Sequence, residues 1–262
     1  MAKVFVCSRF THLDKYLFVH YMKHYKSLGV DGFLINFNYK LAEQKEEFEK
    51  FLDEILNSAF SSNISYSIGP NFELLSETSN ILELYKLVEK EVNLVEDFII
   101  PADSDEFVSF PHPLSEVIVK MTTEKYSYIS GVSEEMIPAD GSIQPLLPEI
   151  DIFSQFPANN SKLFVNPKIG LVKAKFFKYT GVGHHHCNVP EKLVGSEEKI
   201  LSERKAPFTS KTHHFRWNLQ GRSRVENWIK LWEKEDYPGW KDVDKYKKMF
   251  KVYNSNLLDY KG

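Results

Sequence analysis

The sequence predicts an α/β protein with a Rossmann-like, mostly parallel sheet flanked by helices. Two observations predict this class. Short apolar runs alternate with stretches of helical periodicity through about residue 110. Apolar residues also make up 42% of the 262 residues, which is enough for a sizeable core. Strand and helix in alternation build a parallel sheet with right-handed crossovers, and such sheets bind ligands beyond the carboxyl ends of their strands.

The first half of the chain contains four expected strands and three expected helices. Gly29 follows the first helix at the position of a C-cap, and Ser76 is the expected N-cap of the third helix. The expected strands cover residues 4–7, 30–37, 64–68 and 98–100, and the first two helices cover 13–28 and 41–60.

The second half has weaker periodicity. Residues 131–160 are rich in proline, glycine and polar residues, so we expect a long loop region there. Because the pattern changes near residue 110, we expect one domain with two halves, residues 1–110 and 111–262. The remaining expected elements are strands within 169–179 and 210–219, a helix over 223–234 capped by Ser223, and a helix over 243–252.

Charge and composition exclude several classes of protein. Lys and Arg number 33 against 36 Asp and Glu, and this balance argues against a nucleic-acid-binding protein. Two cysteines give no disulfide framework. No run approaches the roughly 18 apolar residues of a membrane span, so we expect a cytoplasmic protein. The lysines within 241–251 predict a solvated helix face, with peripheral contact to an anionic membrane as the alternative.

An acidic cluster, Asp103-Ser104-Asp105-Glu106, directly follows the fourth expected strand. In an extended segment alternate side chains point the same way, so Asp103 and Asp105 can converge on one point. Two converging carboxylates repel each other unless a cation lies between them, and hard oxygen ligands favour Mg²⁺ or Mn²⁺. The alternative is an acidic turn that binds nothing.

The stretch Phe-Ile-Ile-Pro-Ala-Asp-Ser-Asp-Glu-Phe, residues 98–107, resembles the aspartate motif of GT-A fold glycosyltransferases, especially the family 2-like branch. Residues 17–34 resemble the first helix and second strand of that branch, and residues 213–217 resemble its late His-Phe motif. The resemblance is dense over residues 4–110 and patchy up to about 235. It implies a GT-A fold with a nucleotide-sugar-binding half at 1–110 and a loop-rich acceptor-binding half at 111–262.

The resemblance also implies roles for the acidic cluster and two late histidines. Asp105 would bind the metal, and Asp103 would contact the nucleotide ribose or share the metal, with Ser104 between them on the nucleotide side. A third metal ligand would come from His214 or from His186 in the run of three histidines. Neutral imidazole is a competent ligand for Mn²⁺ and a less natural one for Mg²⁺. The alternatives are ordinary packing for His214 and a polar loop for His186.

Further candidates lie at strand ends. Arg9 could pair with the diphosphate, or form a surface salt bridge. Asn36 and Asn38 could bind the base or ribose, or belong to a turn. Asn80 lies in the third expected helix, at a place that resembles the nucleotide-side asparagine of the family.

Glu134 and Glu135 are the candidates for the general base that an inverting transferase needs at the acceptor hydroxyl, although loop carboxylates are more often simply solvated. Arg216 and Trp217 could offer a cation and a stacking plane for a sugar, or pack in the core. The resemblance therefore implies transfer from a UDP-sugar to a glycan or glycolipid acceptor. Two alternatives stay open: a nucleotide-binding protein without turnover, and a metal-dependent nucleotidyltransferase or phosphohydrolase.

Overall fold

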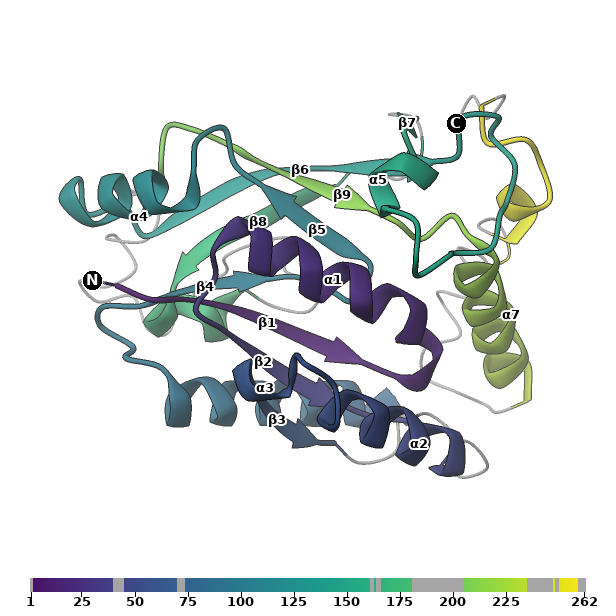
Figure 1. The fold of residues 1–262 in the computed structure, drawn as a ribbon, viewed down its shortest axis with the longest axis horizontal. Helices are drawn as coiled ribbons and strands as arrows, with labels where there is room; N and C mark the ends of the chain where they lie inside the picture. Colours follow the sequence, from purple (N-terminus) through teal and green to yellow (C-terminus); the bar gives the residue numbers. More distant parts are fainter. Residues whose placement is uncertain are drawn as a thin grey trace.

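A computed structural model describes residues 2–39, 45–69, 74–160, 163, 166–180, 205–234, 247 and 250–258. Its centre is a sheet of nine strands, with β7 attached to β6 and the other strands in the order β3-β2-β1-β4-β8-β6-β9-β5. The sheet is mixed and is flanked by helices (Figure 1). The α/β, Rossmann-like fold class is therefore confirmed.

The first half forms the parallel part of the sheet. Strands β3, β2, β1 and β4 lie side by side and all run in the same direction. The elements in chain order are β1 (Val4–Phe10), α1 (Lys15–Leu28), β2 (Gly32–Phe37), α2 (Lys45–Leu56), β3 (Ile64–Ile68), α3 (Leu74–Glu91) and β4 (Phe98–Pro101).

Two apolar cores cover the two faces of this half. The larger core joins α1 and α2 to one face of β1 and β2, and Phe18 and Phe51 meet there edge to face at 6.1 Å. The smaller core joins α3 and the short helix η4 (Ala174–Tyr179) to the other face, through Leu84, Val88 and Phe177. All four expected strands and three expected helices of the first half are confirmed. Gly29 ends α1 with φ 91°, as a C-cap glycine does.

The second half adds antiparallel strands beside β4. Strand β8 pairs antiparallel with β4 and with β6, β9 runs parallel to β6, and β5 pairs antiparallel with β9. Its elements are β5 (Glu106–Ser109), α4 (Leu114–Thr123), β6 (Tyr128–Ile137), α5 (Ile152–Gln155), β7 (Ala158–Asn159), β8 (Pro167–Lys173), β9 (Ser210–His214) and α7 (Leu219–Lys234).

The expected loop over residues 131–160 is wrong, because the ten-residue strand β6 occupies its start. The buried positions of β6 include polar Ser133 and Glu135, so its sequence lacks the apolar alternation that marks a strand. Helix α7 begins at Leu219 and not after Ser223, because Asn218 accepts a hydrogen bond from the backbone N–H of Gly221 (2.8 Å).

Two smaller differences concern the ends of elements. The expected strand at 169–179 ends at Lys173, where η4 begins. Ser76 lies inside α3, which starts at Leu74. Of the C-terminal lysines, Lys247 and Lys251 are exposed and the others lie outside the described residues, as does most of the helix expected at 243–252. Within the described residues, no helix is long and apolar enough to cross a membrane.

Candidate functional site

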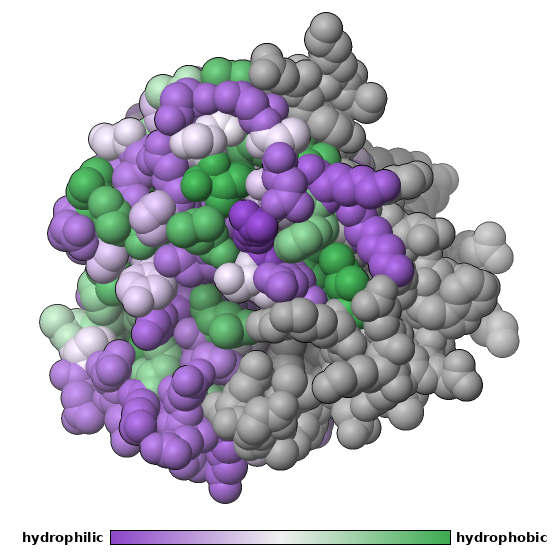
Figure 2. Space-filling model, turned by 90° about the vertical axis from the view of Figure 1, so that its right-hand side faces the viewer, coloured by the Kyte–Doolittle hydropathy of each residue, from purple (hydrophilic) through white to green (hydrophobic). Residues whose placement is uncertain are grey.

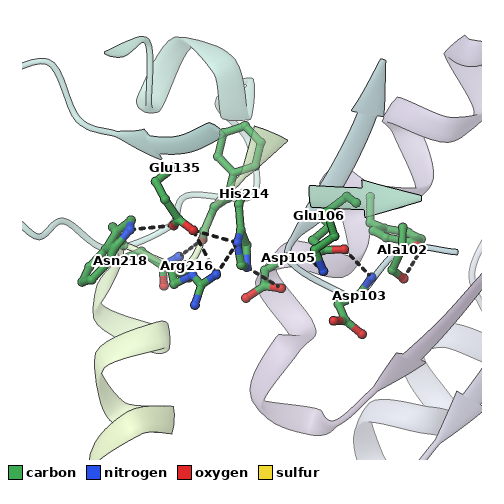
Figure 3. Close-up of polar contacts among 12 residues, drawn as sticks. Ala102, Asp103, Asp105, Glu106, Glu135, His214, Arg216 and Asn218 are labelled. Carbon is green, nitrogen blue, oxygen red and sulfur yellow. Dashed lines mark hydrogen bonds and ion pairs between the residues drawn. The ribbon is translucent and has the colours of Figure 1, made fainter. Parts of the chain in front are cut away.

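The acidic cluster forms a tight turn between β4 and β5, at the carboxyl edge of the parallel strands. The backbone N–H of Glu106 donates to the carbonyl of Asp103 (3.0 Å), and the Glu106 carboxylate accepts from the backbone N–H of Asp103 (3.2 Å). The backbone N–H of Phe215 donates to the carbonyl of Asp105 (2.9 Å). The turn is therefore fixed at both ends, and the Asp105 carboxylate points toward His214 (Figure 3).

His214 lies between two carboxylates that come from distant parts of the chain (Figure 3). Its Nε2 is 3.3 Å from Oδ1 of Asp105, and its Nδ1 is 3.0 Å from Oε1 of Glu135. Strand pairing explains this geometry, because β9 places His214 opposite Glu106 of β5 on one side and opposite Glu135 of β6 on the other. All three side chains of the Asp105–His214–Glu135 group are buried.

Glu135 is itself held by two further donors. The indole Nε1 of Trp217 donates to Glu135 Oε2 (2.7 Å), and Nη2 of Arg216 lies 2.9 Å from Glu135 Oε1. Trp217 is fully buried and packs against the Tyr253 ring at 4.7 Å. Glu135 therefore orients His214, and neither of its oxygens is open to an acceptor molecule.

The charges in this group perturb one another. Burial and the Arg216 charge lower the pKa of His214, but Glu135 and Asp105 outweigh both and raise it to about 9. Burial alone would raise the pKa of Glu135, but His214 and Arg216 outweigh it and lower that pKa below the ordinary value. The raised pKa means that the His214 imidazole holds its proton more strongly than a free imidazole does, and it must lose that proton before Nε2 can bind a metal.

Asp105 and His214, which form an ion pair in this structure, are the described residues that could share a divalent cation. Two ligands that share an ion at about 2.1 Å lie about 3 Å apart when they meet it at a right angle, close to the distance seen here. A histidine that binds a metal usually donates its other ring N–H to a carboxylate, which is the position of Glu135. Among the described residues no group of three potential ligands forms, so water and substrate oxygens would complete the shell.

Arg9 is near the acidic turn, as the sequence predicted. It lies in β1, and its Nη2 is 3.9 Å from Oδ1 of Asp103. Both side chains keep part of their surface exposed, 19% for Arg9 and 31% for Asp103. Ser104, between the two aspartates, is buried. Arg9, Asp103 and Ser104 therefore lie together at the carboxyl edge of the sheet.

The structure shows the contacts of two of the three asparagine candidates. Asn36 and Asn38 are buried at the end of β2, where Asn38 donates to Asn36 (3.3 Å) and Asn36 donates to Ser67 of β3 (3.0 Å). They hold two neighbouring strand ends together. Asn80 lies in α3, and its side chain is outside the described part of the chain.

The remaining candidates are separate from the turn. Glu134 points away from Glu135, as successive strand residues do, and pairs with Lys211 (2.9 Å) on the outer face of the sheet. His186 lies outside the described residues. One residue that sequence reasoning missed is Lys168 of β8, which is buried and forms an ion pair with Glu106. A single lysine before an apolar run gives no sign that it will be buried.

Figure 2 views the edge of the molecule toward which the parallel strands run in Figure 1. On the described part of this face, hydrophobic side chains are interspersed among hydrophilic ones.

Comparison with known proteins gives only distant similarity. No protein-family model matches the sequence, and no curated protein sequence matches it. Solved structures that resemble the chain include HddC from Yersinia pseudotuberculosis, 14% identical with a TM-score of 0.32, covering 82% of this chain and 90% of that one. A UDP-glucose pyrophosphorylase from Acinetobacter baumanii is 10% identical with a TM-score of 0.37, covering 96% and 99%.

Mouse xyloside xylosyltransferase 1 is 12% identical with a TM-score of 0.28, covering 66% of this chain and 68% of that one. All three TM-scores are below 0.5, so they establish no relationship to any of these proteins.

Proposed function

We propose that the protein is a metal-dependent glycosyltransferase that moves a sugar from a UDP-linked donor to a hydroxyl group of a glycan or glycolipid. One observation carries this proposal: Asp105 and the carboxylate-oriented His214 lie 3.3 Å apart at the carboxyl edge of a parallel sheet. In open α/β sheets this edge is where ligands bind. The donor set of one carboxylate and one imidazole suits Mn²⁺ better than Mg²⁺.

Each residue of the turn has a place in this proposal. Asp105 and His214 would hold the metal, which supplies positive charge to the diphosphate as the sugar leaves. Arg9 would contact the same diphosphate, and Asp103 would bind the ribose or share the metal. Glu135, 3.0 Å from Nδ1 of His214, would orient the ring so that Nε2 faces Asp105.

The acceptor side of the reaction needs a general base. Displacement with inversion, which the sequence resemblance implies, needs a base near the acceptor hydroxyl. Neither Glu135, which is buried, nor Glu134, on the outer face, has the geometry of that base. This observation favours a second candidate function, a nucleotide-binding protein that does not turn over.

An assay with a panel of nucleotide-sugars and Mn²⁺ separates the candidates. We expect slow release of UDP from one UDP-sugar, lost on addition of EDTA and in Asp105→Asn, but kept in Asp53→Asn, which changes an exposed aspartate of α2. A thermal shift without UDP release would support the binding protein. Pyrophosphate release from a nucleoside triphosphate would instead identify a nucleotidyltransferase, and either result would overturn the proposal.

A further inference from the structure

The buried ion pair between Lys168 and Glu106 lies directly beneath the acidic turn. The Lys168 side chain keeps 5% of its surface exposed and the Glu106 side chain 1%. Nζ of Lys168 contacts Oε1 of Glu106, and the other oxygen, Oε2, accepts the backbone N–H of Asp103 (3.2 Å). One carboxylate therefore connects a lysine of β8 to the first residue of the metal-binding turn.

Glycine makes this connection across the sheet sterically feasible. Strand β8 is not a hydrogen-bonded neighbour of β5, since β6 and β9 lie between them in the sheet order. Gly170 nevertheless lies so close to β9 and β5 that an added Cβ would overlap the Ser210 side chain and touch Val108 at 3.4 Å. Gly170 has no partner on β6, because the register of β8 with β6 shifts there, and Lys168, two residues earlier, reaches Glu106 of β5 with its side chain.

A buried pair of this kind is costly to form and is not explained by stability alone. Removing two charges from water costs several kcal/mol for each ion, and replacing such a pair by apolar side chains is often neutral or stabilising. Here the pair has a second effect, because Glu106 is also the hydrogen-bond acceptor for Asp103. Lys168 is moreover close enough to Asp103 and Asp105 for both charges to act on it.

We infer that Lys168 and Glu106 are positioning residues, which hold the Asp103–Asp105 turn in its metal-binding conformation before any ligand arrives. This inference rests on the proposed function. Lys168 fixes the rotamer of Glu106, Glu106 fixes the Asp103 amide, and the turn then presents the Asp105 carboxylate to His214. If Lys168 positions the turn, replacing it should weaken metal binding. If Lys168 acted only through its charge, replacing it would strengthen metal binding, because a cation near the site would be gone.

Four variants test the inference by Mn²⁺ titration without substrate and by hydrogen exchange of the Asp103 amide. Lys168→Met removes the charge and keeps the length of the side chain. We expect about tenfold weaker Mn²⁺ binding, as when a residue that supports a metal ligand is lost, and faster exchange of the Asp103 amide. Lys173→Met, the same change at the other end of β8, should alter neither.

Two double variants separate hydrogen bonding from folding. Lys168→Met with Glu106→Gln keeps an oxygen that can accept the Asp103 N–H, whereas Lys168→Met with Glu106→Leu has none. We expect the glutamine variant to approach the parent in Mn²⁺ affinity and amide protection, and the leucine variant to lose both. These variants bury no lone charge, so they keep the inference testable if Lys168→Met alone does not fold.

The outcomes also separate this inference from the proposed function. If the parent binds no Mn²⁺ but the leucine variant still loses protection of the Asp103 amide, the proposed function fails and the positioning role stands. If the folded leucine variant protects that amide as the parent does, or Lys168→Met binds Mn²⁺ as tightly as the parent or more tightly, the inference is overturned.

Discussion

His214 is the residue on which the account of the site depends most. Both of its ring nitrogens face carboxylates, Asp105 at 3.3 Å and Glu135 at 3.0 Å, so the orientation of the ring is fixed. The sequence predicted the pairing of Asp105 with His214, through the resemblance of two short motifs. It assigned Glu135 a different role, because nothing in a sequence shows that a glutamate on one strand will lie beside a histidine 79 residues later.

Trp217→Phe tests whether the donors to Glu135 matter for the metal. The change removes the indole N–H that donates to Glu135 Oε2 at 2.7 Å and keeps an aromatic ring against Tyr253. We expect the free energy of unfolding to fall by about 1–3 kcal/mol, because a buried acceptor loses a donor. We also expect Mn²⁺ affinity to fall about tenfold, because His214 is held less firmly.

Tyr253→Phe is the matched control for that experiment. It removes the hydroxyl that donates to the Arg216 carbonyl (2.6 Å) and leaves the donors to Glu135 unchanged. Denaturant titration and calorimetry with Mn²⁺ should show a stability loss in both variants but weaker Mn²⁺ binding only in Trp217→Phe. Equal Mn²⁺ binding by the two would mean that Trp217 is purely structural.

At the scale of elements, the sequence predicted the parallel half well and the second half poorly. Strands β1, β2 and β4 bury apolar residues, and β3 alternates apolar with polar residues, so the pattern of all four strands is visible in the sequence. Strands β6 and β9 instead bury Ser133, Glu135, Thr212 and His214, because their inner faces line the site. Because these buried positions are polar, the sequences of β6 and β9 lack the apolar alternation by which a strand is recognised. Their positions depend on long-range pairing, which local sequence does not encode.

The contact between β6 and β9 requires glycine at position 131. A methyl group added at Gly131 would overlap the backbone carbonyl of Ser210, which cannot move without distorting β9. We expect Gly131→Ala to lower the free energy of unfolding by about 1–3 kcal/mol, the usual cost of overpacking. Gly32→Ala in β2 is the control, because the nearest atoms there belong to the Phe5 ring, which can shift. A similar loss in both variants, measured by denaturant titration, would contradict this explanation.

The junction of α1 with β5 should make the protein less stable in mild acid. His24 Nε2 lies 2.8 Å from the carbonyl of Val108, and burial lowers the pKa of His24 despite this hydrogen bond. As the pH falls through about 6.5, His24 therefore becomes protonated in the unfolded chain but stays neutral in the folded protein. The stabilising contribution is complete above that pH and is lost as the pH falls below it.

His24→Gln tests this pH dependence. The glutamine amide can still donate to the Val108 carbonyl but does not titrate. We expect the fall in unfolding free energy between pH 7 and pH 5, measured by denaturant titration, to be smaller in this variant than in the parent. An identical slope in both proteins would show that His24 does not contribute to the acid sensitivity.

At the scale of the whole molecule, the acidic turn and the sheet of the second half meet at one place. Asp103 and Asp105 follow β4 of the parallel half, while His214, Glu135 and Lys168 come from the strands added beside it. The assignment of residues 1–110 to the nucleotide and of residues 111–262 to the acceptor stays a prediction. If the metal binds as proposed, both halves contribute ligands, so neither half should bind Mn²⁺ alone.

The most direct test of the central claim is the electron spin-echo spectrum of Mn²⁺ bound to the parent protein and to His214→Gln. A nitrogen directly bonded to Mn²⁺ produces ¹⁴N modulation, which carboxylate and water ligands do not. We predict ¹⁴N modulation in the parent and its loss in His214→Gln, with Mn²⁺ still bound weakly through Asp105. Tight Mn²⁺ binding by the parent without ¹⁴N modulation would show that His214 is not a ligand and would contradict the account.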